Sequence, residues 1–395
     1  MLRLSDDERR ARLGSRHGLA TPRARTPEAA ADAVVALHGT DATSVFLGAL
    51  ARMEGGDVAT VETALYEDRA LLRVLAMRRT MFVASVDTAA VLLAACSRDV
   101  AARERKRLLT ILAVAGVTGR GRSVERWLRG AEEAALEALA RRGEATAAEI
   151  AADDERLGTQ LVLAPGTSYE ARVSVASRVL TVLGAQGLVI RTRPNGTWTS
   201  TQYRWAALSS WHPGVTDHAT EPARAELAAR WLAAFGPATV EDLRWWTGWT
   251  VRQTRAALNA LPTAEVALDG GTTALVRAGD EEPAPRPAPW AALLPALDAT
   301  TMGWKARAWY LGEHGPRLFD ANGNAGPTVW WDGRVVGGWA QAPDGEIRIR
   351  LLEDPGADAR AAVDAAAARI AAQVGGARLR PRARARSPVE RELLT

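Results

Sequence analysis

The sequence predicts an α+β fold in which tandem winged-helix domains, about three in number, precede a small C-terminal β-barrel-like domain. Two observations lead to this fold class. First, helices followed by a two-stranded hairpin, the element order of a winged helix, occur twice in succession over residues 124–277. Second, a strand-rich segment follows a proline-spaced linker at residues 280–289. The predicted domains are residues 1–122, 123–215, 216–282 and 283–395.

The composition indicates a globular chain with a polyanionic partner. Of the 395 residues, 47% are hydrophobic and 24% are charged, which is enough apolar material for several cores. Lys106 and Lys305 are the only lysines among 50 basic residues, and the pI of about 9.7 favours a polyanion such as nucleic acid. The single cysteine, Cys96, excludes an intramolecular disulfide and an iron–sulfur cluster. We therefore expect a cytoplasmic, nucleoid-associated protein.

No membrane, metal or cofactor is expected. Residues 1–10 are charged where a signal peptide needs an apolar centre, and no apolar run approaches the roughly 18 residues of a membrane-spanning helix. His17, His212, His218 and His314 lack the spacing of a metal site, so we treat them as structural residues.

The first domain contains a weaker copy of the winged-helix order. Apolar periodicity predicts helices at residues 27–37, 42–53, 58–65 and 69–76, and a strand at residues 79–85.

The second domain carries clearer signals. We expect a helix at residues 124–142, a short helix at 147–152 capped by Thr146, and a candidate recognition helix at 174–186 that Gly187 ends. Asn195 and Gly196 then mark a hairpin turn between strands at residues 188–193 and 197–205.

The third domain repeats the order, with helices at residues 222–235, 240–246 and 251–261 and a hairpin at 263–277. Beyond the linker, strands are expected at residues 328–331, 334–339, 346–352 and 377–382, with an alanine-rich helix at 357–374. The arginine-rich residues 378–391 are interpreted as a solvated tail.

Tandem winged helices favour nucleic acid as the partner, because such units place a helix in a groove and a hairpin along the phosphates. Winged helices also serve as protein-interaction modules, and each arginine is alternatively an ordinary solvated side chain. The candidate phosphate contacts are Arg78, Arg79, Arg191, Arg193, Arg252 and Arg255.

His38, Gly39, Thr40 and Asp41 form the most informative short segment, since the side chains of His38, Thr40 and Asp41 are able to hold a water molecule. Gly39 removes a side chain between His38 and Thr40 and permits close approach of backbone or ligand. The simpler alternative is that Thr40 or Asp41 is the N-cap of the helix at residues 42–53.

The segments around this motif resemble the winged-helix DNA glycosylases of the AlkZ and YcaQ type. The resemblance rests on residues 38–41, 46–52, 65–69 and 77–82, and it continues through residues 293–298 and 302–304 to 332–339. It implies tandem winged helices and a C-terminal β-barrel around duplex DNA, and excision of alkylated bases, in some members as self-resistance to DNA-alkylating antibiotics. The family's Gln-hydrophobic-Gln or Gln-hydrophobic-Asp motif falls on His38, Gly39 and Thr40, where neither glutamine is present.

The residues suggest how hydrolysis proceeds without those glutamines. His38 hydrogen-bonds the attacking water, Thr40 orients it, and Asp41 stabilises the sugar cation. Neither lysine lies in a recognisable motif for a Schiff base, so we expect a monofunctional glycosylase. About three winged units and a barrel in one polypeptide favour a monomer. The resemblance implies double-stranded DNA with alkylated bases as its partner. The alternatives are a noncatalytic DNA-binding regulator or lesion sensor, and a protein-interaction scaffold. Asp298 and Lys305 are interpreted as an exposed ion pair.

Overall fold

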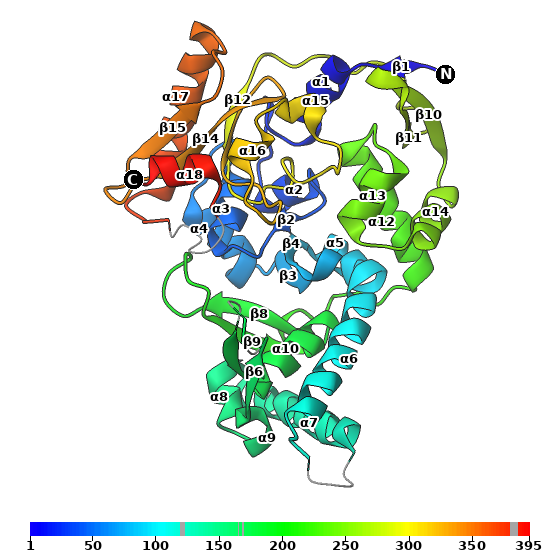
Figure 1. The fold of residues 1–395 in the computed structure, drawn as a ribbon, viewed down its shortest axis with the longest axis vertical. Helices are drawn as coiled ribbons and strands as arrows, with labels where there is room; N and C mark the ends of the chain where they lie inside the picture. The colour runs from blue at the N-terminus through cyan, green and yellow to red at the C-terminus, as the bar shows by residue number, and fades with distance from the viewer. Residues whose placement is uncertain (119–122, 165, 168–169, 380–385) are drawn as a thin grey trace.

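The computed structural model describes residues 1–118, 123–164, 166–167, 170–379 and 386–395. Within them, helices and five small sheets form the mixed α+β fold that the sequence predicts (Figure 1). The long helix α6 (Arg98–Val114) leads away from the body of the molecule to the segment that holds α7 to α10, which lies at the lower end of the view.

The first region holds a three-stranded sheet of order β2-β4-β3. The structure corrects two helix predictions here. Residues 69–76 contain the strand β3, because a short apolar run fits a buried strand as well as a helix. The helix expected at residues 27–37 ends at Asp32, since the φ of 65° at Val35 is incompatible with an α-helix. The elements are α1 (Asp6–Arg16), α2 (Pro27–Asp32), β2 (Leu37–His38), α3 (Ala42–Leu50), α4 (Val58–Glu62), β3 (Leu71–Leu75), β4 (Met81–Ser85) and α5 (Val86–Leu92).

The second region follows its predicted element order. Thr146 caps α8 in a capping box with Glu149, as expected. Several features differ from the prediction: the strand β5, the short helices α9 and α11 and the antiparallel strand pair β6 and β7 are additional, and residues 197–202 form a loop rather than a strand. The elements are α7 (Val124–Arg142), β5 (Glu144–Thr146), α8 (Ala147–Ala151), α9 (Glu155–Gly158), β6 (Gln160–Leu163), β7 (Ala171–Ser174), α10 (Val175–Ala185), β8 (Val189–Pro194), β9 (Tyr203–Ala207) and α11 (Leu208–Trp211).

The third region agrees closely with the prediction. Thr239 and Thr250 cap α13 and α14, and the Gly270-Gly271 turn joins β10 to β11. The N-terminal strand β1 (Arg3–Leu4) adds to this sheet, parallel to β10. The N-terminal segment of the first region therefore lies in the sheet of the third region. The elements are α12 (Thr220–Phe235), α13 (Val240–Thr247), α14 (Val251–Asn259), β10 (Thr263–Leu268) and β11 (Thr273–Arg277).

The C-terminal sheet is open, so the prediction of a barrel-like domain is not confirmed. Its order is β12-β13-β14-β15, and within the described residues no hydrogen-bonded pairing joins the two edge strands. Instead of closure, α17 packs on β12 and β13, and α18 packs on β14 and β15. The elements are β12 (Ala291–Leu294), α15 (Ala308–Leu311), α16 (Gly315–Leu318), β13 (Thr328–Trp331), β14 (Arg334–Gln341), β15 (Ile347–Leu351), α17 (Ala357–Val374) and α18 (Pro388–Leu393).

The expected solvated tail is packed in part: Ser387, Val389 and Glu390 are buried, whereas Arg378 and Arg391 are exposed. Residues 386–395 carry α18, whose Val389 is buried and would meet any side chain at Gly338 of β14. Residues 377–379 form no strand, and residues 380–385 of the expected strand and tail lie outside the described residues.

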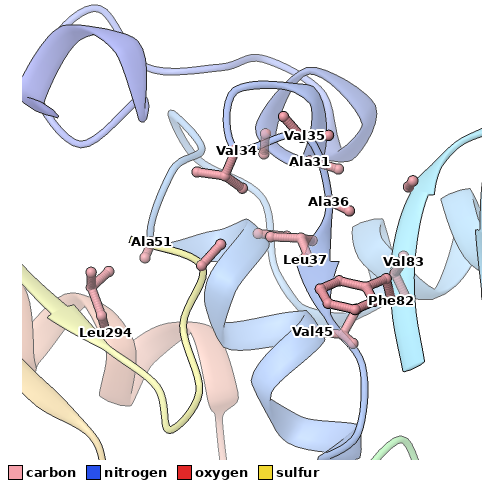
Figure 2. Packing of buried hydrophobic residues seen from close by; sticks show 14 of the residues in the cluster. Ala31, Val34, Val35, Ala36, Leu37, Val45, Ala51, Phe82, Val83 and Leu294 are labelled. Carbon is pink, nitrogen blue, oxygen red and sulfur yellow. The ribbon is translucent and has the colours of Figure 1, made fainter. Parts of the chain in front are cut away.

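One apolar core unites the first, third and C-terminal regions, whereas α7, α8, α9 and α10 pack around a second core. Figure 2 shows part of the first core around Leu37 of β2, with Val45 of α3 and Phe82 of β4. Burial of this side of β2 fixes the backbone of the neighbouring His38.

A buried ion pair crosses the core between α3 and the C-terminal region. Arg52 donates to both carboxylate oxygens of Asp298, at 2.9 and 2.7 Å, and also to Thr300 Oγ1 at 2.8 Å. Thr300 Oγ1 in turn lies 2.8 Å from Nδ1 of His17, whose Nε2 is 3.1 Å from the carbonyl of Ala234. The interpretation of Asp298 as the partner of Lys305 is therefore wrong; Lys305 pairs with Glu241.

We predict that this network makes the protein acid-sensitive below pH 6.5. Burial and the nearby Arg52 charge lower the pKa of His17 from 6.5 to about 3, so between these values the unfolded chain binds a proton that the native state excludes. The contribution of His17 is therefore present above pH 6.5 and falls with pH by up to about 1.4 kcal/mol per unit. Urea unfolding of the wild type and His17→Gln at pH 6.5 and pH 5 measures it; the variant should lose less stability, and equal losses would contradict the assignment.

Candidate functional site

The motif segment lies where β2 passes into α3, held against β4. His38 pairs with Phe82, and the Gly39 amide donates to the Met81 carbonyl at 2.7 Å. A Cβ atom at Gly39 would lie 3.3 Å from that carbonyl oxygen. The close approach that Gly39 permits is therefore that of the β4 backbone.

His38 is largely buried, with 7% of its surface exposed. Its ring meets Phe82 edge-on, with 5.2 Å between the ring centroids. Nδ1 lies 3.5 Å from the Thr40 amide, a long contact in which the ring nitrogen is the acceptor. These contacts place the His38 ring against Phe82 of β4 and link it to the backbone of Thr40.

Thr40 and Asp41 lie nearer to solvent. Thr40 is exposed, and Asp41 is half-buried. Asp41 is the N-cap of α3, accepting from the Thr43 amide at 2.9 Å and from its hydroxyl at 2.6 Å, so the capping interpretation is confirmed for this residue. The capped helix ends at Leu50, three residues before its predicted end.

Asp41 also lines a pocket between α3 and the C-terminal sheet. Ser44 and Leu47 line the α3 side, and Trp339 and Gln341 of β14 line the other. Ser44 donates to the carbonyl of Ala296 at 2.7 Å, which fixes the helix against this wall. The sequence motif therefore faces a concave surface made partly by the C-terminal region.

Arg78 and Arg79 form the turn between β3 and β4, both with positive φ. Arg79 is exposed and pairs with Glu104 at 2.8 Å. The guanidinium of Arg78 lies 4.2 Å from the ring centre of Trp245, and that of Arg307 lies 4.7 Å from the same ring. Burial, with the charge of Arg307 nearby, lowers the pKa of Arg78 to about 10. Arg78 of the hairpin and Arg307 of the C-terminal region therefore place two cations beside one tryptophan.

Arg191 and Arg193 of β8 differ in their surroundings. Arg193 pairs with Glu67 at 2.5 Å and Glu62 at 3.6 Å, which joins the second region to the first. Arg191 lies over the rings of Tyr203 and Trp205, at 5.4 and 5.1 Å from their centres. Burial lowers the pKa of Arg191, and the charge of Arg73 adds to this effect.

Arg252 and Arg255 are exposed on α14, and no ion pair joins either of them to a residue in the described ranges. The expected recognition helix α10 is different: none of its residues is exposed. Among the predicted contacts, the two α14 arginines are thus open to a polyanion, whereas Arg79 and Arg193 already have acidic partners.

Two further arginines were not predicted as site residues. Arg307 shares Trp245 with Arg78, and Arg73 lies buried in the middle of β3. Arg73 had a signal in the sequence, because a charged residue inside an apolar run is unusual. Arg307 had none, since its partner Trp245 is 62 positions earlier in the chain.

Among the described residues, no group of three or more His, Cys, Asp or Glu residues gathers as metal ligands would, and none of the described helices combines the length and apolarity needed to cross a bilayer.

A family model described as DNA glycosylase AlkZ-like matches residues 31–373. The solved structure of the DNA glycosylase AlkZ from Streptomyces sahachiroi matches with a TM-score of 0.73 and 21% sequence identity, over 96% of this chain and 100% of that one. At this identity the structural match shows a common fold. No curated protein sequence matches the chain significantly.

Two variants of Asp41 separate its capping role from its charge. Asp41→Ala removes the acceptor for the Thr43 amide and is expected to lower the free energy of unfolding by about 1 kcal/mol. Asp41→Asn keeps an acceptor oxygen at the N-cap and should leave stability within a few tenths of a kcal/mol of the wild type. Urea unfolding measures both. Equal losses would mean that the charge, and not the cap, stabilises α3.

Proposed function

The chain belongs to the AlkZ-like DNA glycosylase family, and we propose that it is a monofunctional enzyme that hydrolyses the N-glycosidic bond of N7-alkylated purines in duplex DNA. The family match supports a DNA repair glycosylase. The observation that carries the finer proposal is the placement of Thr40 and Asp41 at the N-terminal end of α3. By the resemblance, Thr40 stands at the last position of the family's catalytic motif, and Asp41 is the residue that follows it. By the same resemblance, bulky antibiotic adducts belong to the proposed substrates.

The chemistry requires little of the protein. An N7-alkylated guanine carries a positive charge, so its glycosidic bond is weakened before binding. The enzyme then has to stabilise an oxocarbenium-like sugar and position one water molecule. In this proposal the carboxylate of Asp41 stabilises the sugar cation and the hydroxyl of Thr40 orients the water.

His38 receives a different role from the one that the sequence suggested. With 7% of its surface exposed and Nδ1 near the Thr40 amide, it is better placed to hold the turn than to touch the water. We assign it as a positioning residue for Thr40. Hydrolysis without a covalent step is supported by the lysines, because Lys305 pairs with Glu241 and Lys106 lies on α6.

The DNA-binding surface is proposed to include Arg78, Arg307, Arg252 and Arg255. Their guanidinium groups lack carboxylate partners at ion-pair distance among the described residues. We retain winged helices as the interpretation of the three helix–hairpin units, but the covered helix α10 favours contacts through loops and hairpins in the second unit.

A noncatalytic DNA-binding protein is the second candidate. It is favoured by one observation: both glutamines of the resembling motif are replaced, and the residue at the first position, His38, is buried. Such a protein would bind alkylated duplex without releasing a base.

We predict that excision depends on the charge of Asp41. A duplex with one N7-methylguanine, and a matched duplex with a bulky N7 adduct, are incubated with the protein and then cleaved at abasic sites by hot alkali. The wild type should produce strand scission on at least one duplex. Asp41→Asn should be slower by about 100-fold or more, because the cap remains and only the charge is lost.

His38→Gln, which installs the residue of the resembling motif, is the matched control and should stay active, whereas His38→Ala should be slower. Salt-sensitive binding to both duplexes without scission would overturn the enzymatic proposal in favour of the noncatalytic one.

A second prediction concerns the α14 arginines. The double variant Arg252→Ala, Arg255→Ala should reduce the slope of log affinity for duplex DNA against log salt concentration by about 1.8, because two phosphate contacts are lost. Fluorescence anisotropy at several salt concentrations measures the slope. Arg317→Ala, which removes an arginine paired with Glu392, is the control and should leave it unchanged. An unchanged slope in the double variant would place DNA elsewhere.

A further inference from the structure

Arg73 is a buried cation at the boundary between the first and second regions. It lies in the middle of β3, opposite Val83 of β4, and only 4% of its surface is exposed. β3 packs against α10 and β8 of the second region. There Arg73 lines a pocket together with Thr181, Arg191 and Trp205.

The guanidinium of Arg73 is poorly satisfied by the protein. Nη2 donates to the hydroxyl of Tyr66 at 3.3 Å, and the group lies 5.0 Å from the ring centre of Tyr203. No acceptor in the described residues lies within hydrogen-bond distance of Nε or Nη1. Burial works against the charge, yet the pKa of Arg73 lies above its ordinary value because the phenol groups of Tyr66 and Tyr203 favour the cation.

Arg191 brings a second cation to the same pocket. Its guanidinium lies 5.4 Å from the centre of the Tyr203 ring that also contacts Arg73, and its Nε also has no acceptor among the described residues. No ion pair joins either arginine to an acidic residue in the described ranges. Two guanidinium groups therefore share one pocket without a carboxylate to balance them.

Arg52 shows what a structural buried arginine looks like in this protein. It is fully buried, and it holds both oxygens of Asp298, the Gly48 carbonyl and the Thr300 hydroxyl. Arg73 is almost as deeply buried but has one long hydrogen bond to a neutral group. A buried charge without a partner destabilises a fold, so its retention points to a partner that arrives from outside.

An anion with several acceptor oxygens would balance both charges. A neutral carbonyl would use one or two donors but would leave both charges uncompensated, whereas a phosphate group supplies negative charge and oxygens for a guanidinium fork. The pocket also adjoins a more open groove. Arg191 and Trp205 line both, and the groove continues past Ser177, Asn195 and Gln202.

We propose that Arg73 and Arg191 form a phosphate-binding site that holds one phosphodiester group of bound DNA between the β3–β4 hairpin and the second region. The assignment of the phosphate to DNA rests on the proposed function, whereas the oxyanion chemistry rests on the pocket alone. Arg191 was already expected to contact DNA; the structure adds Arg73 as its buried partner.

The test compares Arg73→Met with Arg52→Met. Melting temperature is measured in chloride and in inorganic phosphate at equal ionic strength, and affinity for an undamaged duplex is measured by anisotropy over a range of salt. In chloride, Arg73→Met should melt no lower than the wild type, because an unpaired charge is removed, whereas Arg52→Met should melt well below it.

Arg73→Met should also bind DNA about tenfold or more weakly, with the slope of log affinity against log salt reduced by about 0.9. Arg191→Met is the second variant and should reduce the slope by the same amount.

Unchanged slopes in both variants overturn the proposal. If the slopes stay unchanged while inorganic phosphate raises the melting temperature of the wild type and not of Arg73→Met, the site takes free phosphate and the DNA assignment is wrong. Arg317→Ala, which removes an arginine paired with Glu392, is the control and should bind DNA like the wild type. Reduced slopes without base excision by the wild type would sustain the phosphate site and remove only the glycosylase.

Discussion

The buried ion pair between Arg52 and Asp298 is the interaction on which the rest of the structure depends. Arg52 follows the end of α3, and Asp41 caps the start of the same helix, so the pair fixes the element that carries the motif. Through Thr300 and His17 it reaches the carbonyl of Ala234 in α12. Segments from four parts of the chain are thus held in one register around the site. Losing one partner of such a pair leaves an uncompensated charge, which typically costs about 3–5 kcal/mol.

The buried arginines Arg52 and Arg73 differ in what balances their charge. At Arg52 both oxygens of Asp298 balance the charge inside the protein, and only Nε has no acceptor among the described residues. Arg73 and Arg191 lie at the boundary between the first and second regions and have no carboxylate partner among the described residues. We propose that an anion binds between them. Arg193 pairs with Glu62 and Glu67 and so joins the second region to the first beside the pocket. The two sides of the pocket are thereby held together, while Arg73 and Arg191 have no carboxylate partner in the described ranges.

Much of the fold is predictable because it is locally encoded. Capping residues such as Thr239 and Thr250, the Gly270-Gly271 turn and the long periodic runs of α7 and α17 fix their elements within a few residues. β3 was mistaken for a helix because a short run buried on both faces has no distinguishing period, and the open C-terminal sheet depends on helices that pack from later in the chain. The candidate site is predictable only in part. The capping role of Asp41 depends on neighbouring residues and is predictable, whereas the ion pairs of the arginines depend on residues such as Glu104 that are distant in sequence.

The central claim is that this chain removes an alkylated base by hydrolysis at the Thr40–Asp41 turn. Mass spectrometry of the small molecules released from a duplex carrying one N7-alkylguanine tests it most directly, with borohydride present in a parallel reaction to trap any Schiff base. The claim predicts the free, intact N7-alkylguanine together with an abasic strand and no protein–DNA adduct. A trapped adduct, or a duplex that is bound but releases no base, would contradict it.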